Sequence, residues 1–249
     1  MIPPAPVVRY GSHPDQVANL HLPAADGGPW PCVILIHGGF WRERWDRTLM
    51  TPLAIDLAQR GFAAWNIEYR RVGHEGGGWP GTFDDVAAAA DALADIAEVD
   101  QARLVAVGHS AGGHLALWLG ARTGGRVRVR AAVSQAGVAD LAQAHADDLG
   151  GGAVAALLGG GPDEFPDRYA RASPAALVPL GAAQLLVHGA ADDVVPPTQS
   201  RAHNVRASAA GDDVELVELP GADHFDVVDP THEAWRAVVQ RLPRLLGTA

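Results

Sequence analysis

The chain has 249 residues, of which 48% are hydrophobic and 19% are charged, a composition typical of a globular protein and not of a disordered or fibrous one. Its formal net charge of -10 argues against the basic surface that a nucleic-acid partner would require. All 19 basic residues are arginines, which excludes lysine Schiff-base and Ser–Lys chemistry. Cys32 is the single cysteine, so an intramolecular disulfide is excluded and a zinc–thiolate site is disfavoured.

The first residues lack the charged and apolar regions of a secretion signal, and no segment is apolar for the ~20 residues that a membrane helix needs. We therefore expect a cytoplasmic protein with neither a membrane nor a nucleic acid as partner. The length suits one large α/β domain, which we expect to span residues 1–249. The sequence leaves the oligomeric state open.

Short apolar segments alternate with helical segments along the chain. The predicted strands are residues 17–22, 32–36, 62–67, 104–107, 131–134, 184–187 and 214–219. The predicted helices are residues 82–97, 114–121, 198–210 and 231–246, with Thr82 as the N-cap of the first. Continuously apolar strands such as residues 32–36 are typical of parallel strands covered on both sides. The alternation predicts an α/β fold with a mostly parallel central sheet and helices on both faces.

Residues 140–180 fit this pattern least well, because they are rich in glycine and alanine. We expect them to form a short lid or insertion. Active sites of parallel α/β sheets lie at the carboxyl ends of the strands. Reactive residues are therefore expected in the loops that follow the strands.

One such loop carries the motif Gly-His-Ser-Ala-Gly-Gly at residues 108–113, between a predicted strand and an apolar helical segment. This is the context of a nucleophile elbow, in which a serine occupies a strained turn and small neighbours let the strand and helix approach closely. The motif therefore predicts Ser110 as a nucleophile.

A second motif, His-Gly-Gly-Phe-Trp at residues 37–41, follows another buried strand. Glycines leave backbone N–H groups accessible, and such preorganised donors stabilise the oxyanion of a tetrahedral intermediate. We predict an oxyanion hole formed by Gly38, Gly39 and the N–H of Ala111. Which amide among residues 38–40 points inward depends on backbone geometry and stays open.

The acid that accompanies the serine is expected after a late strand, where Asp192 and Asp193 stand side by side. The third position after Gly189 is where this loop usually presents its acid, so Asp192 is favoured and Asp193 is the rival that would brace the loop. Asp140, which follows an earlier strand, is a more distant alternative.

The predicted base is His224, in the loop between the strand at residues 214–219 and the last helix. The order Ser, Asp, His along the chain is that of hydrolases with a nucleophile elbow. The other ten histidines lack this combination of order and loop position, and we expect His109 and His188 to make structural hydrogen bonds. No histidine spacing is typical of a metal site, so neither a metal nor a cofactor is predicted.

Together with Glu-Tyr-Arg-Arg at residues 68–71 and the loop at residues 188–196, these motifs resemble the α/β-hydrolase superfamily over nearly the whole chain. They are similar to small esterases of the branch that contains kynurenine formamidases and feruloyl-esterase-like enzymes, and prolyl-oligopeptidase catalytic domains share them. The resemblance implies an α/β-hydrolase fold and hydrolysis of esters or aryl formamides through an acyl-enzyme, without a cofactor. Phe40 replaces a further glycine of hormone-sensitive-lipase-type enzymes, which argues against that branch.

Four aromatic residues, Phe40, Trp41, Tyr69 and Trp79, fall on or near loops expected to border the site. They predict an aromatic or apolar acyl pocket, with ordinary packing as the alternative. The leading function is that of a carboxylic ester hydrolase acting on a small molecule. An aryl formamidase, a small amidase or peptidase, and a non-catalytic binding protein of the same fold remain as alternatives.

Overall fold

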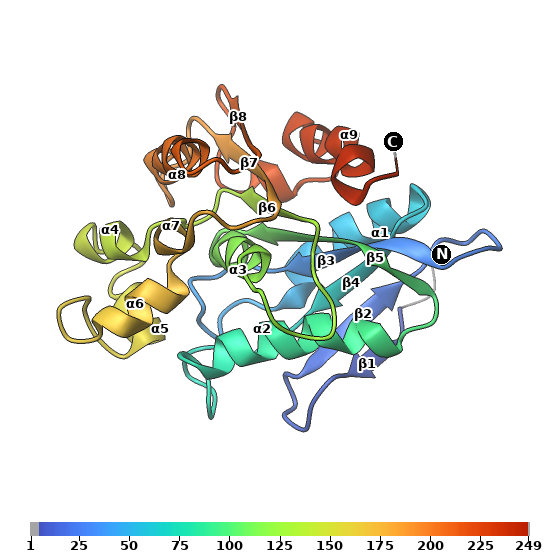
Figure 1. The fold of residues 1–249 in the computed structure, drawn as a ribbon, viewed down its shortest axis with the longest axis horizontal. Helices are drawn as coiled ribbons and strands as arrows, with labels where there is room; N and C mark the ends of the chain where they lie inside the picture. Colours follow the sequence, from blue (N-terminus) through green and yellow to red (C-terminus); the bar gives the residue numbers. More distant parts are fainter. Residues whose placement is uncertain (1–4, 249) are drawn as a thin grey trace.

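The computed structural model describes residues 5–248 and is built on an eight-stranded sheet in the order β1-β2-β4-β3-β5-β6-β7-β8 (Figure 1). The strands are β1 (Val7–Arg9), β2 (Val17–His21), β3 (Trp30–Ile36), β4 (Ala63–Ile67), β5 (Val99–His109), β6 (Ala131–Gln135), β7 (Ala183–Gly189) and β8 (Val214–Leu219). Among the strand pairs formed within residues 5–248, only β1–β2 and β2–β4 are antiparallel. The predicted mostly parallel sheet is confirmed.

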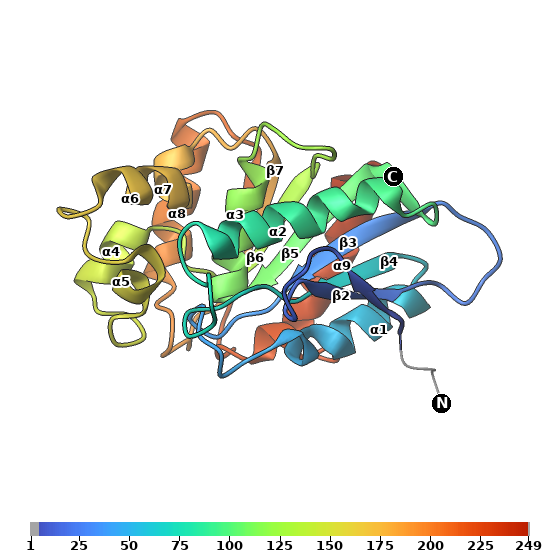
Figure 2. The ribbon, with the colours of Figure 1, turned by 90° about the horizontal axis from the view of Figure 1, so that it is seen from below.

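Helices cover both faces of this sheet, as Figure 2 shows. The longer helices are α1 (Thr51–Gln59), α2 (Gly81–Asp91), α3 (Ala111–Gly120), α8 (Thr198–Ala209) and α9 (Glu233–Leu246). Short 3-10 helices are η1 (Arg47–Met50), η2 (Ala92–Asp95) and η3 (Asp226–Val228). None of the helices in residues 5–248 is both long enough and apolar enough to cross a membrane.

The sheet separates the two largest apolar clusters of the described residues because alternate side chains of a strand point to opposite faces. In β3, Val33 and Leu35 pack in the core formed with α1 and α9. Ile34 and Ile36, which lie between and after them, pack in the core formed with α2 and α3. This burial on both faces explains why the strand reads as a continuous apolar segment.

Residues 140–180 form a helical insertion between β6 and β7, at one side of the molecule (Figures 1 and 2). Its helices are α4 (Leu141–Ala146), α5 (Ala153–Leu158), α6 (Pro166–Ala172) and α7 (Pro174–Leu177). The insertion reaches the loop after β3, since Arg42 Nη2 donates a hydrogen bond of 2.5 Å to the carbonyl of Gly151. Its role as a lid stays a prediction.

The start of α2 differs from the prediction, because Thr82 is not the N-cap. The helix begins at Gly81, and Pro80 occupies the cap position. The buried Thr82 hydroxyl instead donates to the carbonyl of Arg70 at 2.6 Å and accepts from the N–H of Gly78 at 3.0 Å. Hydrogen bonds to the loop between β4 and α2 thus occupy the hydroxyl that the sequence alone assigns to capping.

Candidate active site

Ser110 occupies a strained turn between β5 and α3. Its backbone angles are φ 55° and ψ −119°, a conformation that costs a residue with a side chain about 1–3 kcal/mol. A Cβ at Gly108 would collide with the carbonyl oxygen of Gly112, and a Cβ at Gly112 would collide with that of Ile36. The flanking glycines are therefore required by close backbone approach, and the serine lies at the carboxyl end of the strand, as a nucleophile elbow demands.

Asp192 and His224 meet at the same edge of the sheet, in the loops after β7 and β8. The His224 Nδ1–H donates to Asp192 Oδ2 at 2.7 Å, and both side chains are buried. The other oxygen, Oδ1, accepts from the N–H groups of Val194 and Val195, each at 2.9 Å. These bonds hold the carboxylate in the orientation that fixes the imidazole.

The two rival aspartates have other surroundings. The Asp193 side chain is exposed to solvent. Asp140 caps α4 by accepting hydrogen bonds from the N–H groups of Ala142 and Gln143. Of the three acids considered from the sequence, Asp192 is the one that contacts His224.

A second histidine also contacts Asp192. His188 Nε2 lies 3.1 Å from the same Oδ2 and 2.9 Å from the carbonyl of Val195, while its Nδ1 lies 2.7 Å from the Ser200 hydroxyl. Burial alone would raise the pKa of Asp192, but hydrogen bonds from His188 and His224 outweigh it and hold this pKa well below its ordinary value. The acid therefore stays ionised and can stabilise a protonated His224.

His109 joins the serine turn to the His224 loop. Its Nε2–H donates to the backbone carbonyl of His224 at 2.9 Å, and the two rings lie 4.7 Å apart. Burial, followed by the neighbouring His224, lowers the pKa of His109 to about 3, so its ring is neutral at physiological pH. Within residues 5–248 the structure forms no hydrogen bond between Ser110 and His224, a contact that commonly tightens only when substrate binds.

The glycines after β3 pass directly beside the serine. A Cβ at Gly38 would lie 2.9 Å from the Cβ of Ser110, so only a glycine lets the backbone come this close. Gly39 has a φ of 113°, in the region that favours glycine. Ala111 begins α3 next to the nucleophile, at the positive end of the helix dipole. The three candidate oxyanion donors thus belong to segments that adjoin Ser110.

A buried network of polar side chains, formed by His37, Glu68 and Arg71, contacts this glycine loop. His37 places Nδ1 2.8 Å from the carbonyl of Gly38 and Nε2 2.8 Å from Glu68 Oε1. The hydroxyl of Tyr69 donates to the carbonyl of His37 at 2.9 Å, and the two rings are stacked at 4.4 Å. Arg71 Nη1 lies 3.4 Å from the Glu68 carboxylate. The motif at residues 68–71 therefore holds the glycine loop in position through its contacts with His37.

Replacing Glu68 by glutamine is expected to lower the free energy of unfolding by about 3 kcal/mol or more, because the buried Arg71 loses a compensating negative charge and His37 loses a carboxylate partner. Burial would raise the pKa of Glu68, but the hydrogen bond and charge of His37, with Arg71, lower it below its ordinary value. Because the pKa of Glu68 is lower in the folded than in the unfolded protein, its ionised carboxylate stabilises the folded state above the unfolded pKa of about 4.3. This contribution to stability is lost as the pH falls through the folded pKa.

Urea unfolding at several pH values measures this effect. The difference in free energy of unfolding between wild type and Glu68→Gln should be constant near neutral pH and should shrink on acidification below about pH 4.3. Glu98→Gln, at an exposed position, is the matched control and should leave stability unchanged. A difference that grows in acid would contradict the assignment of a buried, ionised Glu68.

Two of the four aromatic residues predicted to line an acyl pocket do not line one, and that part of the prediction is wrong. Trp41 and Tyr69 are fully buried, at 0% exposure. Trp41 Nε1–H donates to His114 Nδ1 at 3.2 Å, inside the core. The positive φ of Phe40 and of Trp41 turns the chain, and the sequence does not reveal which side chain that turn sends inward.

The other two aromatic residues, Phe40 and Trp79, are partly exposed and lie beside the helical insertion. A Cβ at Gly150 would come within 2.5 Å of the Phe40 ring. Trp79 packs against Phe83 at a ring distance of 5.0 Å, and the guanidinium of Arg171 lies 5.3 Å from its ring centre. Contact of Phe40 or Trp79 with a substrate stays a prediction.

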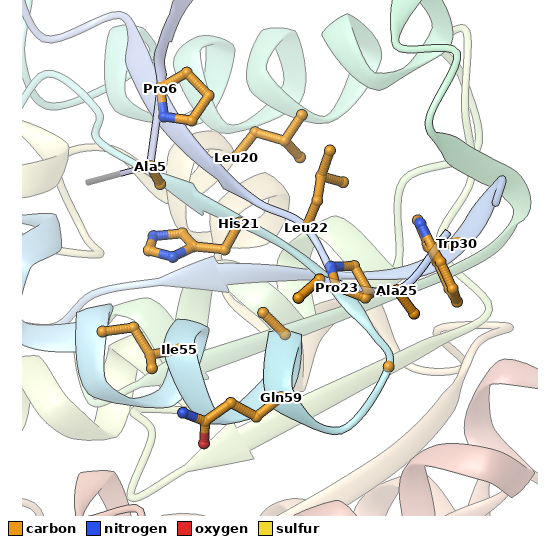
Figure 3. A pocket seen from close by; sticks show the side chains of 13 residues that line it. Ala5, Pro6, Leu20, His21, Leu22, Pro23, Ala25, Trp30, Ile55 and Gln59 are labelled. Atoms are coloured by element: carbon orange, nitrogen blue, oxygen red, sulfur yellow. The ribbon is translucent and has the colours of Figure 1, made fainter. Parts of the chain in front are cut away.

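An apolar pocket of about 620 Å³ lies away from these residues, at the amino ends of β3 and β4 (Figure 3). Leu20, His21, Trp30 and Ile55 are among the residues that line it. Substrates of parallel α/β sheets bind at the opposite, carboxyl edge, where Ser110 lies. The pocket is therefore separate from the candidate active site.

Comparison with known proteins identifies the family. The model of the BD-FAE family matches residues 18–206, more than half of the chain. An uncharacterized protein of Mycobacterium tuberculosis (strain H37Rv) is 28% identical over 217 residues, covering 85% of this chain and 69% of that protein.

The solved structures that this chain resembles share its fold. A truncated carbohydrate esterase from gut microbiota matches with a TM-score of 0.85 and 24% identity, covering 97% of this chain and 95% of that one. An acetyl ester-xyloside bifunctional hydrolase from Caldicellulosiruptor lactoaceticus matches with a TM-score of 0.80 and 22% identity, covering 99% and 98%. A propionate-bound esterase 2 from Thermogutta terrifontis gives 0.78 and 22%, covering 99% and 94%. The expected α/β-hydrolase fold is thereby confirmed, and the chain belongs to the BD-FAE family and is a carboxylic ester hydrolase.

Proposed function

We propose that this esterase acts through an acyl-enzyme on Ser110, with His224 as general base and Asp192 as the acid that orients it. The observation that carries the proposal is the buried 2.7 Å hydrogen bond between His224 and Asp192, beside a serine held in a strained turn. A serine needs an adjacent base to become a nucleophile, and the base needs a third group to fix its tautomer.

The mechanism follows from these roles. Ser110 Oγ attacks the ester carbonyl while His224 takes its proton, and the amides of Gly38, Gly39 and Ala111 stabilise the oxyanion. His224 then returns the proton to the leaving alcohol, and Ser110 keeps the acyl group. A water molecule, activated by His224 in the same way, releases the acid.

We infer that the substrates are esters of short acyl groups, including esters of carbohydrates. One solved structure described above is named a carbohydrate esterase, a second is named an acetyl ester-xyloside bifunctional hydrolase, and a third holds propionate. The competing substrate is an aryl formamide, which the His-Gly-Gly-Phe-Trp motif brings into consideration.

Specificity constants for a panel of substrates test this inference. We expect kcat/KM for acetyl, propionyl and butyryl esters to exceed that for N-formylkynurenine by about tenfold or more, since specificity is the ratio of these constants. Ser110→Ala should remove turnover of every member of the panel. A higher kcat/KM for the formamide would overturn the assignment to short-chain esters.

A further inference from the structure

Two exposed aromatic rings lie together beside the candidate active site. Trp45 is 37% exposed and Phe225 is 46% exposed, and their ring centres are 5.9 Å apart. They come from distant parts of the chain, the loop after β3 and the loop after β8. Single exposed apolar side chains are ordinary, but two rings meeting at a reactive centre call for an explanation.

This aromatic pair, Trp45 and Phe225, connects the base to the oxyanion loop. The Phe225 ring lies 5.3 Å from the ring of His224 and 5.7 Å from that of His109. On the other side, a Cβ at Gly39 would lie 2.7 Å from the Cβ of Trp45. A substrate held between His224 and the glycine loop therefore has the aromatic pair next to it.

The direction of proton transfer tells which half of the ester meets the pair. His224 must deliver a proton to the oxygen of the leaving alcohol, so that alcohol lies against the imidazole while the acyl group stays on Ser110. Phe225 follows His224 in the chain and packs at right angles to its ring, with an interplanar angle of 88°. The alcohol group is thus the half that extends toward Phe225 and Trp45.

The pair is held in place by the protein itself. The N–H of Phe225 donates to Asp223 Oδ1 at 2.8 Å, and the backbone carbonyl of Trp45 accepts a hydrogen bond from the buried Arg71. These contacts anchor the backbone of both residues, so binding has only the side-chain torsions of the two rings left to fix.

We propose that the aromatic pair binds the leaving alcohol and that this alcohol carries a ring with an apolar face, as a pyranoside does; this rests on the acyl-enzyme function proposed above. The residues that flank the two rings in the chain carry both signs of charge, since they include the exposed Glu43, Arg44 and Asp223. Carboxylates accept hydrogen bonds and a guanidinium donates them, so both favour a ring that bears hydroxyl groups.

The experiment compares esters that share one acyl group, namely the acetates of a methyl xyloside, of ethanol and of 4-nitrophenol. In Trp45→Ala and in Phe225→Ala, kcat/KM for the acetylated xyloside should fall about tenfold more than that for ethyl acetate, which offers no ring to stack. The loss should fall on acylation and not on deacylation, because the alcohol has left before deacylation begins. Trp45→Phe, which keeps a ring, should restore most of the lost activity.

Val205→Ala is the matched control, since this apolar side chain is 68% exposed on α8. Equal losses with all three acetates, or no loss with any, would overturn the proposal. A larger loss with 4-nitrophenyl acetate than with the xyloside would overturn the pyranoside assignment in favour of an aromatic alcohol. Acid quenching and mass spectrometry of the wild type report the acetyl–Ser110 intermediate separately. If this intermediate were absent, the acyl-enzyme mechanism would be rejected. The ratio of kcat/KM for the acetylated xyloside to kcat/KM for ethyl acetate would still test the aromatic pair.

Discussion

Ser110→Ala is expected to lower kcat for ester hydrolysis by about five orders of magnitude or more, the loss typical of removing the nucleophile of a triad. The substitution deletes one oxygen atom from a side chain that is almost fully buried at the turn between β5 and α3. The amides of the oxyanion loop and the binding surface remain, so a small residual rate above the uncatalysed reaction is expected.

Steady-state kinetics with a 4-nitrophenyl ester measure this loss, and circular dichroism verifies the fold. Ser208→Ala, at an exposed position of α8, is the matched control and should hydrolyse the ester at the wild-type rate. A Ser110→Ala enzyme that keeps more than about one hundredth of the wild-type kcat would not be explained by a covalent mechanism on this serine.

Asp192→Asn is expected to lower kcat by about four orders of magnitude, while Asp193→Asn should stay within about twofold of wild type. Asp192 Oδ1 accepts two backbone N–H groups, which would also hold the oxygen of an asparagine. The new NH2 group would then face the N–H donors of His224 and His188, and no bond could form. His224 would turn or change its tautomer, and the base would be lost.

The two neighbouring substitutions make the same chemical change one residue apart, so they separate position from charge. Both are read as kcat at the same pH, with thermal unfolding to show that each variant is folded. If Asp193→Asn carried the large loss, or if the two variants lost activity equally, Asp192 would not be the acid of the triad.

Much of the fold could be predicted because burial on both faces leaves continuous apolar segments in the sequence. β3 and β4 are the clearest cases, and the elbow was recognisable because its glycines are required by backbone contacts. β1 was missed because its three residues pair only with β2 and carry no such signal. α1 was missed although Leu53, Ala54 and Leu57 form a buried helical face that the sequence does contain.

The surroundings of the reactive residues were harder to predict, because they depend on side-chain direction in loops. Their position on or near loops that border the site favours Trp41 and Tyr69 as pocket residues, but both are buried. The exposed rings beside the site belong to Trp45 and Phe225, which no motif singles out. The contact of His188 with Asp192 likewise arises where a loop folds back on its own strand, and residue spacing does not reveal it.

The most direct test of the catalytic assignment is to find which residue a fluorophosphonate labels. Mass spectrometry of the digested protein should detect one adduct, on the peptide that contains Ser110, and ester hydrolysis should disappear in proportion to labelling. The adduct should be absent from Ser110→Ala and present in Ser208→Ala. An adduct on another serine, or full ester hydrolysis after complete labelling of Ser110, would contradict the mechanism.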